Sequence, residues 1–194
     1  MKISFLASHG GSAAKYIISA IRNKHLDAEI GLVITNNRDS DIYQWCTENA
    51  VEVIYISAKT HPLEEQKDGF IQQTLQQAGT DLIVLSGYMK KMGPKTVATF
   101  ANKILNIHPS LLPRHGGKGL YGDKVHESVL KSGDKQSGAT VQFINDEYDA
   151  GPIVLQKKVN VVADDTIASL KAKVQAIEAE LYLESINLII KDIL

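Results

Sequence analysis

The sequence has a single cysteine, Cys46, and no block of basic residues. One cysteine excludes an intramolecular disulfide and a zinc site built from several cysteines, so it favours a reducing compartment. Twenty-one basic residues nearly balance twenty-two acidic ones, and the formal charge is −1. This balance argues against nucleic acid or an anionic membrane as a partner.

Long hydrophobic segments are also lacking. The chain starts with MKISFLASHGG, in which a short apolar run ends at a glycine pair. Such a run is too short for the apolar region of a signal peptide or for a membrane span, so we expect a cytoplasmic protein. The 194 residues, 44% of them hydrophobic, are enough for one buried core, and they predict a single domain over 1–194.

Short apolar runs instead alternate with helical patterns. The runs are rich in Val, Ile and Leu, as is typical of parallel strands buried on both faces: KISFLA, EIGLVIT, VEVIYI and DLIVLSG. This alternation predicts an α/β fold with an open, mostly parallel twisted sheet and helices on both faces. Later strands are expected within 139–147 and 152–162, and a helix over 123–133 ends at Gly133. A final helix over 166–193 is expected to cover the sheet.

Two polar residues interrupt the apolar run KILNIHPSLLP, residues 103–113. Asn106 and His108 are two positions apart, so their side chains share one face of a strand, and Pro109 ends that strand. Ligands of such sheets bind beyond the carboxyl ends of the strands. His108 is therefore better explained as an acid or base beside an oxyanion-stabilising amide than as a core histidine.

A glycine turn, ASHGGSAAKYI, joins the first strand to the first helix. Gly10 and Gly11 allow an anion to approach the backbone, and Ser12 and free N–H groups can bind it, although an ordinary turn explains the pattern equally well. The turn does not match G-x-G-x-x-G, and the second strand ends without an acidic residue that could hold a ribose. These absences argue against a nicotinamide dehydrogenase.

Several other residues are open to two interpretations. Met89 and Met92 are either core residues or an adaptable wall for a flat aromatic ligand. Asp149 lies in NDEYDAG, where acidic residues commonly form turns, but a carboxylate near His108 would favour the imidazolium form. No histidine spacing indicates a metal site.

Taken together, LNIHPSLLP, DEYDAGPIVLQ and SGYMKKMGP resemble the folate-dependent formyltransferase family, in order from residue 1 to about 182. The most specific part is N-x-H-P-S-L-L-P, followed by D-x-G-P. The resemblance implies the family's Rossmann-like fold. It also implies a phosphate- and acceptor-binding half over 1–100 and a catalytic and folate-binding half over 101–194.

In that family, an amine attacks the formyl group of 10-formyltetrahydrofolate, and no metal is required. The resemblance implies that His108 is the general acid, that Asn106 binds the oxygen of the tetrahedral intermediate, and that Asp149 keeps His108 protonated. The implied folate-binding residues are Met89, Lys90, Lys91, Met92, Asn106, Asn145, Asp146, Glu147 and Tyr148. The implied residues for the phosphorylated amine substrate are Gly10, Gly11, Ser12, Ala13 and Glu178, with Gln175 as a weaker candidate.

The expected acceptor is 5-phosphoribosylglycinamide, an intermediate of purine synthesis, although three positions depart from that branch of the family. Ala13 replaces an asparagine of the phosphate turn, Gln142 replaces a histidine, and no arginine lies near Glu64 to meet the folate tail. Another amine, water as in a hydrolase, or non-catalytic binding of folate or a phosphorylated metabolite therefore stay open. Hydrolase, sugar and tRNA branches usually carry additional domains, which favours the glycinamide reaction. The loop 114–122 is expected to act as a lid or substrate wall.

Overall fold

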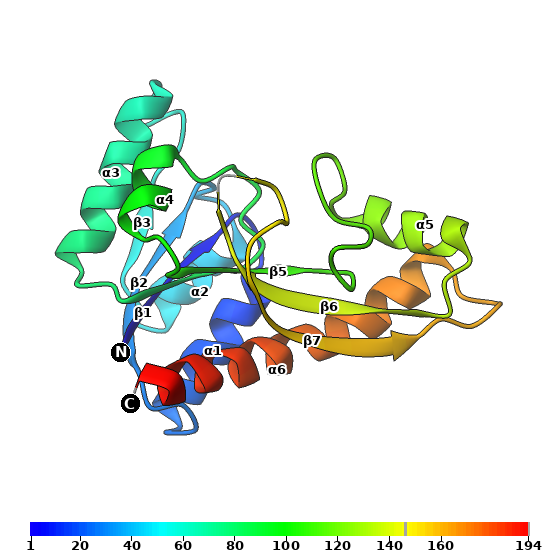
Figure 1. Ribbon diagram of the computed structural model, residues 1–194. Coiled ribbons are helices and arrows are strands. Elements are labelled where there is room, and N and C mark those ends of the chain that lie inside the picture. The colour runs from blue at the N-terminus through cyan, green and yellow to red at the C-terminus, as the bar shows by residue number, and fades with distance from the viewer. Residues whose placement is uncertain (146, 194) are drawn as a thin grey trace. The chain divides into compact units, whose positions relative to one another are not determined.

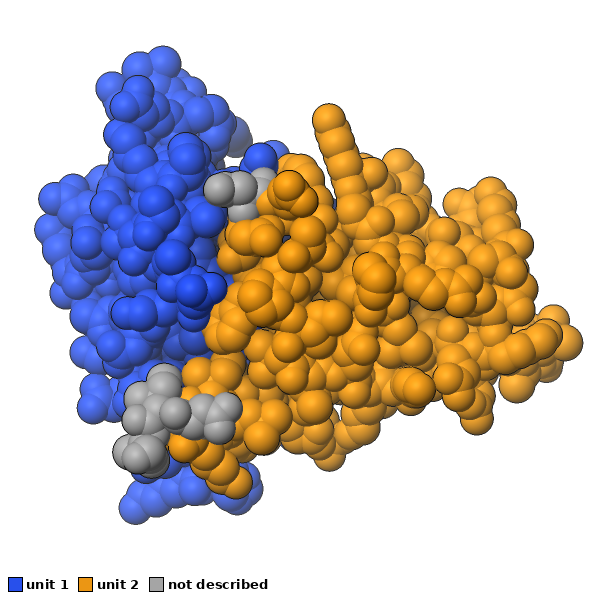
Figure 2. Space-filling view, viewed as in Figure 1, with its two compact units in different colours: residues 1–105 blue, residues 106–194 orange. Residues whose placement is uncertain are grey.

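The computed structural model describes residues 1–145 and 147–193. The chain divides into two compact units, residues 1–105 and 106–194 (Figure 2). Seven strands form one sheet in the order β3-β2-β1-β4-β5-β6-β7, which confirms the predicted α/β class and mostly parallel sheet. The division of binding roles between 1–100 and 101–194 stays a prediction.

The first unit contains the βαβ series (Figure 1). Its strands pair in parallel, β1 with β2 and β4, and β2 with β3. All of β4 and all but the first residue of β1 are buried, as expected for central parallel strands. The elements are β1 (Lys2–Ala7), α1 (Ser12–Arg22), β2 (Glu29–Thr35), α2 (Asp41–Glu48), β3 (Val53–Tyr55), α3 (Glu64–Gln77), β4 (Leu82–Leu85) and α4 (Pro94–Thr99).

A buried carboxylate, Asp68, joins α3 to the start of α4. It accepts hydrogen bonds from the N–H groups of Lys95 at 2.7 Å and Thr96 at 3.1 Å, and from the Thr96 hydroxyl at 2.6 Å. These N–H groups lie in the first turn of α4 and have no partner within that helix. A Cβ on Gly93 would lie 2.1 Å from the Asp68 carboxyl carbon. The contact therefore needs glycine, and it fixes the chain directly after residues 89–92.

The second unit combines β6 (Gln136–Phe143) and β7 (Ile153–Asn160) with two helices, α5 (Asp123–Ser132) and α6 (Ile167–Ile193). Strand β5 (Ile104–His108) precedes them and crosses the boundary between the units. The two later strands are antiparallel, and α6 packs along both of them (Figure 1). This confirms that the last helix covers the sheet.

Strand β6 begins earlier than the sequence predicted, at Gln136 rather than at residue 139. Ser137 and Gly138 lie ahead of the predicted start, and glycine is disfavoured in strands. The backbone of Gly138 is extended, and a Cβ there would lie 2.0 Å from the Lys157 carbonyl oxygen. Glycine is therefore needed for close approach to β7. The predicted end of α5 is correct, since Gly133 caps the helix in the left-handed conformation.

No helix in residues 1–145 or 147–193 is long and apolar enough to cross a membrane.

Candidate functional site

The end of β5 presents Asn106 and His108, as the two-residue period predicted. His108 is buried, with 4% of its surface exposed, whereas Asn106 is half-buried. Within the described part of the chain, no hydrogen-bond partner is found for the Asn106 amide. That amide is therefore available to a ligand, while the imidazole beyond it is held by the protein.

Both ring nitrogens of His108 face acceptors. Nε2 lies 2.9 Å from the backbone oxygen of His115, and Nδ1 lies 3.5 Å from Oδ2 of Asp149. A carbonyl oxygen only accepts, so Nε2 carries a hydrogen and donates it. The doubly protonated imidazolium is the form that can donate to both neighbours.

Asp149 is held by three donors in a turn. The N–H of Gly117 donates to Oδ2 at 2.9 Å, the Gln142 side-chain amide donates to Oδ1 at 3.1 Å, and His108 approaches the same carboxylate. The Asp149 side chain is 13% exposed, and its φ of +55° is a value that Asp adopts more readily than most residues. An ionised carboxylate is the form that satisfies all three donors.

The sequence did not distinguish Asp149 from its acidic neighbours, because all of them fit a turn. In the structure, Asp149 contacts His108, whereas the acidic neighbour Glu147 is exposed. Tyr148, another predicted folate-binding residue, is also exposed. Asn145 accepts a hydrogen bond from the Glu147 N–H at 3.0 Å, which shapes the turn. The predicted folate contact of Asp146 lies outside the described residues. Gln142 was noted only as a departure, and its hydrogen bond to Asp149 was not anticipated.

Glu178, a predicted acceptor-binding residue, lies on α6 one turn before the fully buried Tyr182. Burial raises the pKa of Glu178 from 4.5 to about 7. The pKa of Tyr182 is raised well above its usual value by burial and then by the Glu178 charge, while a backbone hydrogen bond from Ile107 opposes the rise. The hydrogen bond between Tyr182 and the Ile107 backbone ties α6 to β5. Ile107 is the residue between Asn106 and His108.

Gln175, the weaker acceptor-binding candidate on the same helix, is exposed.

We expect the Glu178→Gln variant to change how stability depends on pH. The folded-state pKa is raised, so the contribution of Glu178 is fully present below about pH 4.5 and is lost as the pH rises through about 7. The neutral amide avoids that loss. At each pH the unfolding free energy of the variant is compared with that of wild type. This difference should favour the variant by roughly 2 kcal/mol more at pH 8 than at pH 4. Urea denaturation at both pH values measures this gain.

The matched control for this measurement is Glu180→Gln on the same helix. Glu180 is exposed and pairs with Lys157. The Glu180→Gln change should therefore lower the unfolding free energy slightly at pH 8, whereas Glu178→Gln should raise it. An equal pH dependence for wild type and Glu178→Gln would show that the Glu178 carboxyl is hydrated rather than buried.

The predicted phosphate turn forms the start of α1 in the first unit. Gly11 occupies the N-cap position in the left-handed conformation, with no side-chain cap. A Cβ at Gly11 would lie 2.7 Å from the Ile42 side chain, so the turn requires glycine. The N–H of Ala14 binds the Ser86 hydroxyl at 3.0 Å, whereas Ser12 is exposed. Gly10 and Ala13 complete the turn, whose N-terminal N–H groups and helix dipole suit an anion.

Residues 89–92 follow β4 in the same unit. Met89, Lys90 and Lys91 are exposed, whereas Met92 is 6% exposed and packs in the core. The Met89 N–H donates to the Ser8 hydroxyl at 2.8 Å, which anchors the segment to the end of β1. Met92 thus fits the core interpretation, and exposed Met89 can still meet a ligand.

The described residues contain no group of three or more His, Cys, Asp or Glu side chains that could hold a metal ion. Cys46 is buried, and burial raises the pKa of its thiol to about 11, so it is a packing residue rather than a nucleophile.

Comparison with known proteins gives a consistent result. A family model described as "Formyl transferase" matches residues 1–186. The chain is 36% identical over 98% of its length to a chloroplastic phosphoribosylglycinamide formyltransferase of Arabidopsis thaliana, but it spans only 66% of that relative. It is also 36% identical to the phosphoribosylglycinamide formyltransferase of Haemophilus influenzae, covering 93% of this chain and 83% of the relative.

A solved structure agrees with these sequence relatives. Glycinamide ribonucleotide transformylase 1 from Symbiobacterium toebii superposes with a TM-score of 0.91 and is 30% identical, covering 99% of this chain and 88% of that one.

Proposed function

Because the chain belongs to the formyl transferase family, we propose that it transfers a formyl group from 10-formyltetrahydrofolate to the amine of 5-phosphoribosylglycinamide. The observation that carries this proposal is the arrangement of Asn106, His108 and Asp149, in which a free amide precedes an imidazole held by a carboxylate and a carbonyl. The names of the relatives from Arabidopsis thaliana and Haemophilus influenzae support the choice of acceptor.

In the proposed reaction, the amine nitrogen attacks the formyl carbon, and the carbonyl electron pair moves onto the formyl oxygen. The Asn106 amide and the His108 imidazolium donate hydrogen bonds to this oxyanion. The His108 nitrogen that serves is Nδ1, because Nε2 is committed to the His115 carbonyl, whereas the contact of Nδ1 with Asp149 is long at 3.5 Å.

The intermediate collapses when the electron pair returns to the carbonyl and the bond to N10 of the folate breaks. The products are the formylated amine and tetrahydrofolate, and the proton lost by the amine ends on N10. Asp149 is the base nearest to His108, so it stabilises the imidazolium and organises this proton transfer.

The remaining predicted residues would bind the two substrates. The uncapped start of α1 at Gly10–Ala13 has the donors that a phosphate needs, and Glu178 can accept hydrogen bonds from ribose hydroxyls once it is ionised, above about pH 7. The folate would be held at 89–92 and 145–148, with Asn106 at its formyl group. A cytoplasmic location, and the absence of nucleic acid or membrane partners, stay predictions from composition.

The test is formyl transfer from 10-formyltetrahydrofolate to 5-phosphoribosylglycinamide, followed by the absorbance of tetrahydrofolate, with an acceptor-free control. Acceptor-dependent turnover supports the proposal. Turnover that does not require acceptor would identify a hydrolase. Turnover with a different amine only would assign another acceptor. If no tetrahydrofolate forms with any amine or with water, a non-catalytic binding role is left.

A further inference from the structure

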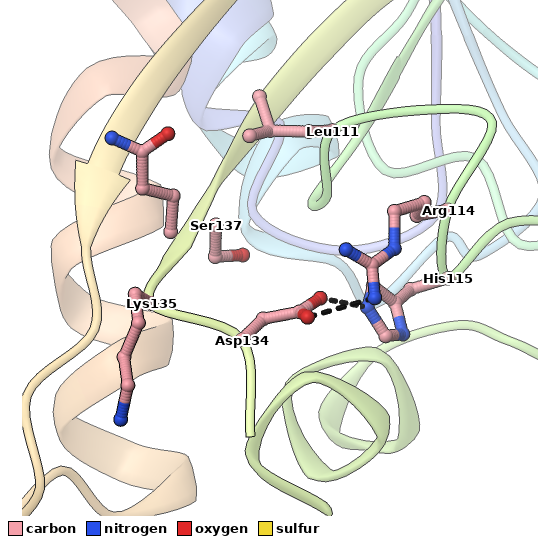
Figure 3. Close-up of a pocket in the computed structure, with 7 residues that line it drawn as sticks. Leu111, Arg114, His115, Asp134, Lys135 and Ser137 are labelled. Carbon is pink, nitrogen blue, oxygen red and sulfur yellow. Dashed lines mark hydrogen bonds and ion pairs between the residues drawn. The ribbon is translucent and has the colours of Figure 1, made fainter. Parts of the chain in front are cut away.

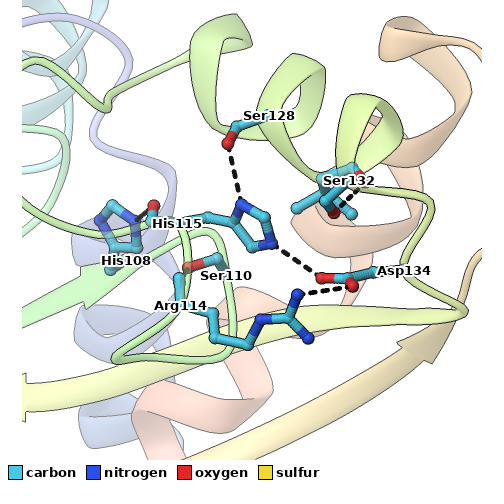
Figure 4. A network of polar contacts seen from close by, with 8 residues as sticks. His108, Ser110, Arg114, His115, Ser128, Ser132 and Asp134 are labelled. Carbon is cyan, nitrogen blue, oxygen red and sulfur yellow. Dashed lines mark hydrogen bonds and ion pairs between the residues drawn. The ribbon is translucent and has the colours of Figure 1, made fainter.

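A histidine in the loop after β5 lies at the centre of a polar network (Figure 4). The ring of His115 lies with Nδ1 2.8 Å from the Ser128 hydroxyl on α5 and with Nε2 2.8 Å from Oδ2 of Asp134. Arg114 binds the other oxygen of Asp134 at 2.7 Å. The His115 side chain is 11% exposed and is fixed between α5 and Asp134, which lies two positions before β6.

The backbone of the same residue meets His108. The φ of His115 is +56°, a value that costs free energy for a non-glycine residue unless its surroundings hold it. In this conformation its carbonyl oxygen lies 2.9 Å from Nε2 of His108. The Ser110 hydroxyl donates to the adjacent Arg114 carbonyl at 2.7 Å, which restrains the loop from its other side.

We propose that His115 is a positioning residue for His108. Its side chain is anchored by Ser128 and Asp134, and its carbonyl accepts the hydrogen on Nε2 of His108. This contact leaves Nδ1 of the His108 ring facing Asp149. The inference deepens the proposed function, on which its catalytic consequence rests. The loop that carries the anchor also reaches Asp149, because the Gly117 N–H donates to that carboxylate at 2.9 Å. The contacts of Nε2 with the His115 carbonyl and of Nδ1 with Asp149 together set the orientation of the His108 ring.

The charge of Asp134 supports the anchor. The hydrogen bond from His115 and the nearby Arg114 guanidinium lower the pKa of Asp134 below its usual value, so this residue is a carboxylate at neutral pH. A carboxylate accepts from Nε2 of His115, which leaves Nδ1 of that ring for the Ser128 hydroxyl. Loss of the anchor would free the strained peptide to turn its carbonyl away from His108.

The anchor borders a surface pocket of about 340 Å³, shown in Figure 3 with the ion pairs of Asp134. It is lined by Leu111, Arg114, His115, Asp134, Lys135, Gln136 and Ser137. Because this pocket is open to water, groups that lose a partner in a variant can be hydrated. We therefore expect substitutions at His115 to fold.

The experiment compares His115→Phe with wild type by ¹⁵N NMR of the histidine rings and by steady-state kinetics. The phenylalanine keeps a ring of similar size and removes both anchoring hydrogen bonds. We expect the Nε2 signal of His108 to move toward the position of a ring nitrogen without a fixed hydrogen-bond acceptor, because the His115 carbonyl no longer holds it. We expect kcat to fall by about 10- to 100-fold. The KM values for folate and acceptor should change by less than about 3-fold, because ground-state binding is untouched.

Two further variants keep the result interpretable. Ser128→Ala removes one anchoring bond without altering His115, and should shift the same NMR signals in the same direction by a smaller amount. His25→Phe makes the same exchange at an exposed histidine and should change neither measurement.

Unchanged His108 signals in folded His115→Phe would overturn the proposal, as would a loss expressed only in KM. The NMR measurement needs no substrate. If wild type failed to transfer formyl groups while His115→Phe still altered the His108 signals, the positioning contact would stand and the proposed function would fail.

Discussion

Replacing His108 with alanine should lower kcat for formyl transfer by about 10³-fold. The imidazolium supplies a hydrogen bond to the oxyanion that exists only during the reaction, so its loss should act on kcat rather than on binding. His108 is buried at the end of β5 and meets two protein acceptors, Asp149 and the His115 carbonyl. The measurement is kcat by tetrahydrofolate absorbance, together with the dissociation constant for tetrahydrofolate by calorimetry.

The dissociation constant should stay within about 3-fold of wild type, because the variant removes an interaction of the transition state. His25→Ala, at an exposed histidine, is the control for the substitution itself. Turnover at the wild-type rate in a folded His108→Ala protein would remove His108 from the reaction.

The second large effect is expected for Asp149→Asn, with a fall in kcat of about 10²-fold or more. The three partners of this carboxylate are donors, the Gly117 N–H, the Gln142 amide and His108. An asparagine offers one accepting oxygen, so at least one donor loses its partner. Asn tolerates the φ of +55°, so the backbone of the turn should be kept.

The matched control is Asp164→Asn, which removes an exposed carboxylate of the same unit and should leave kcat unchanged. The measurement is kcat by tetrahydrofolate absorbance, together with the dissociation constant for tetrahydrofolate by calorimetry. Turnover at the wild-type rate in a folded Asp149→Asn protein would remove this carboxylate from the reaction.

Much of the fold is set by local patterns that the sequence displays directly. The apolar runs predicted buried parallel strands because a strand covered on both faces needs no polar alternation, and β1 and β4 have that burial. Asn106 and His108 share a strand face because side chains alternate with a period of two. The end of α5 at Gly133 follows from glycine's ease in the left-handed conformation. Each of these depends on residues within a few positions of one another.

Contacts between distant segments were decided only by the tertiary structure. Asp149, Gln142 and Gly117 meet across 7 to 32 positions of the chain, and nothing in NDEYDAG marks which acid turns inward. Gly138 lies in β6 ahead of the predicted start of that strand, and its missing side chain makes room for the Lys157 carbonyl. The sequence by itself determined which residue types stand at the ends of the strands. The packing of separate segments decided which carboxylate and which carbonyl hold His108. A hydrogen bond forms only between groups that lie close in space, and these groups are not neighbours in the sequence.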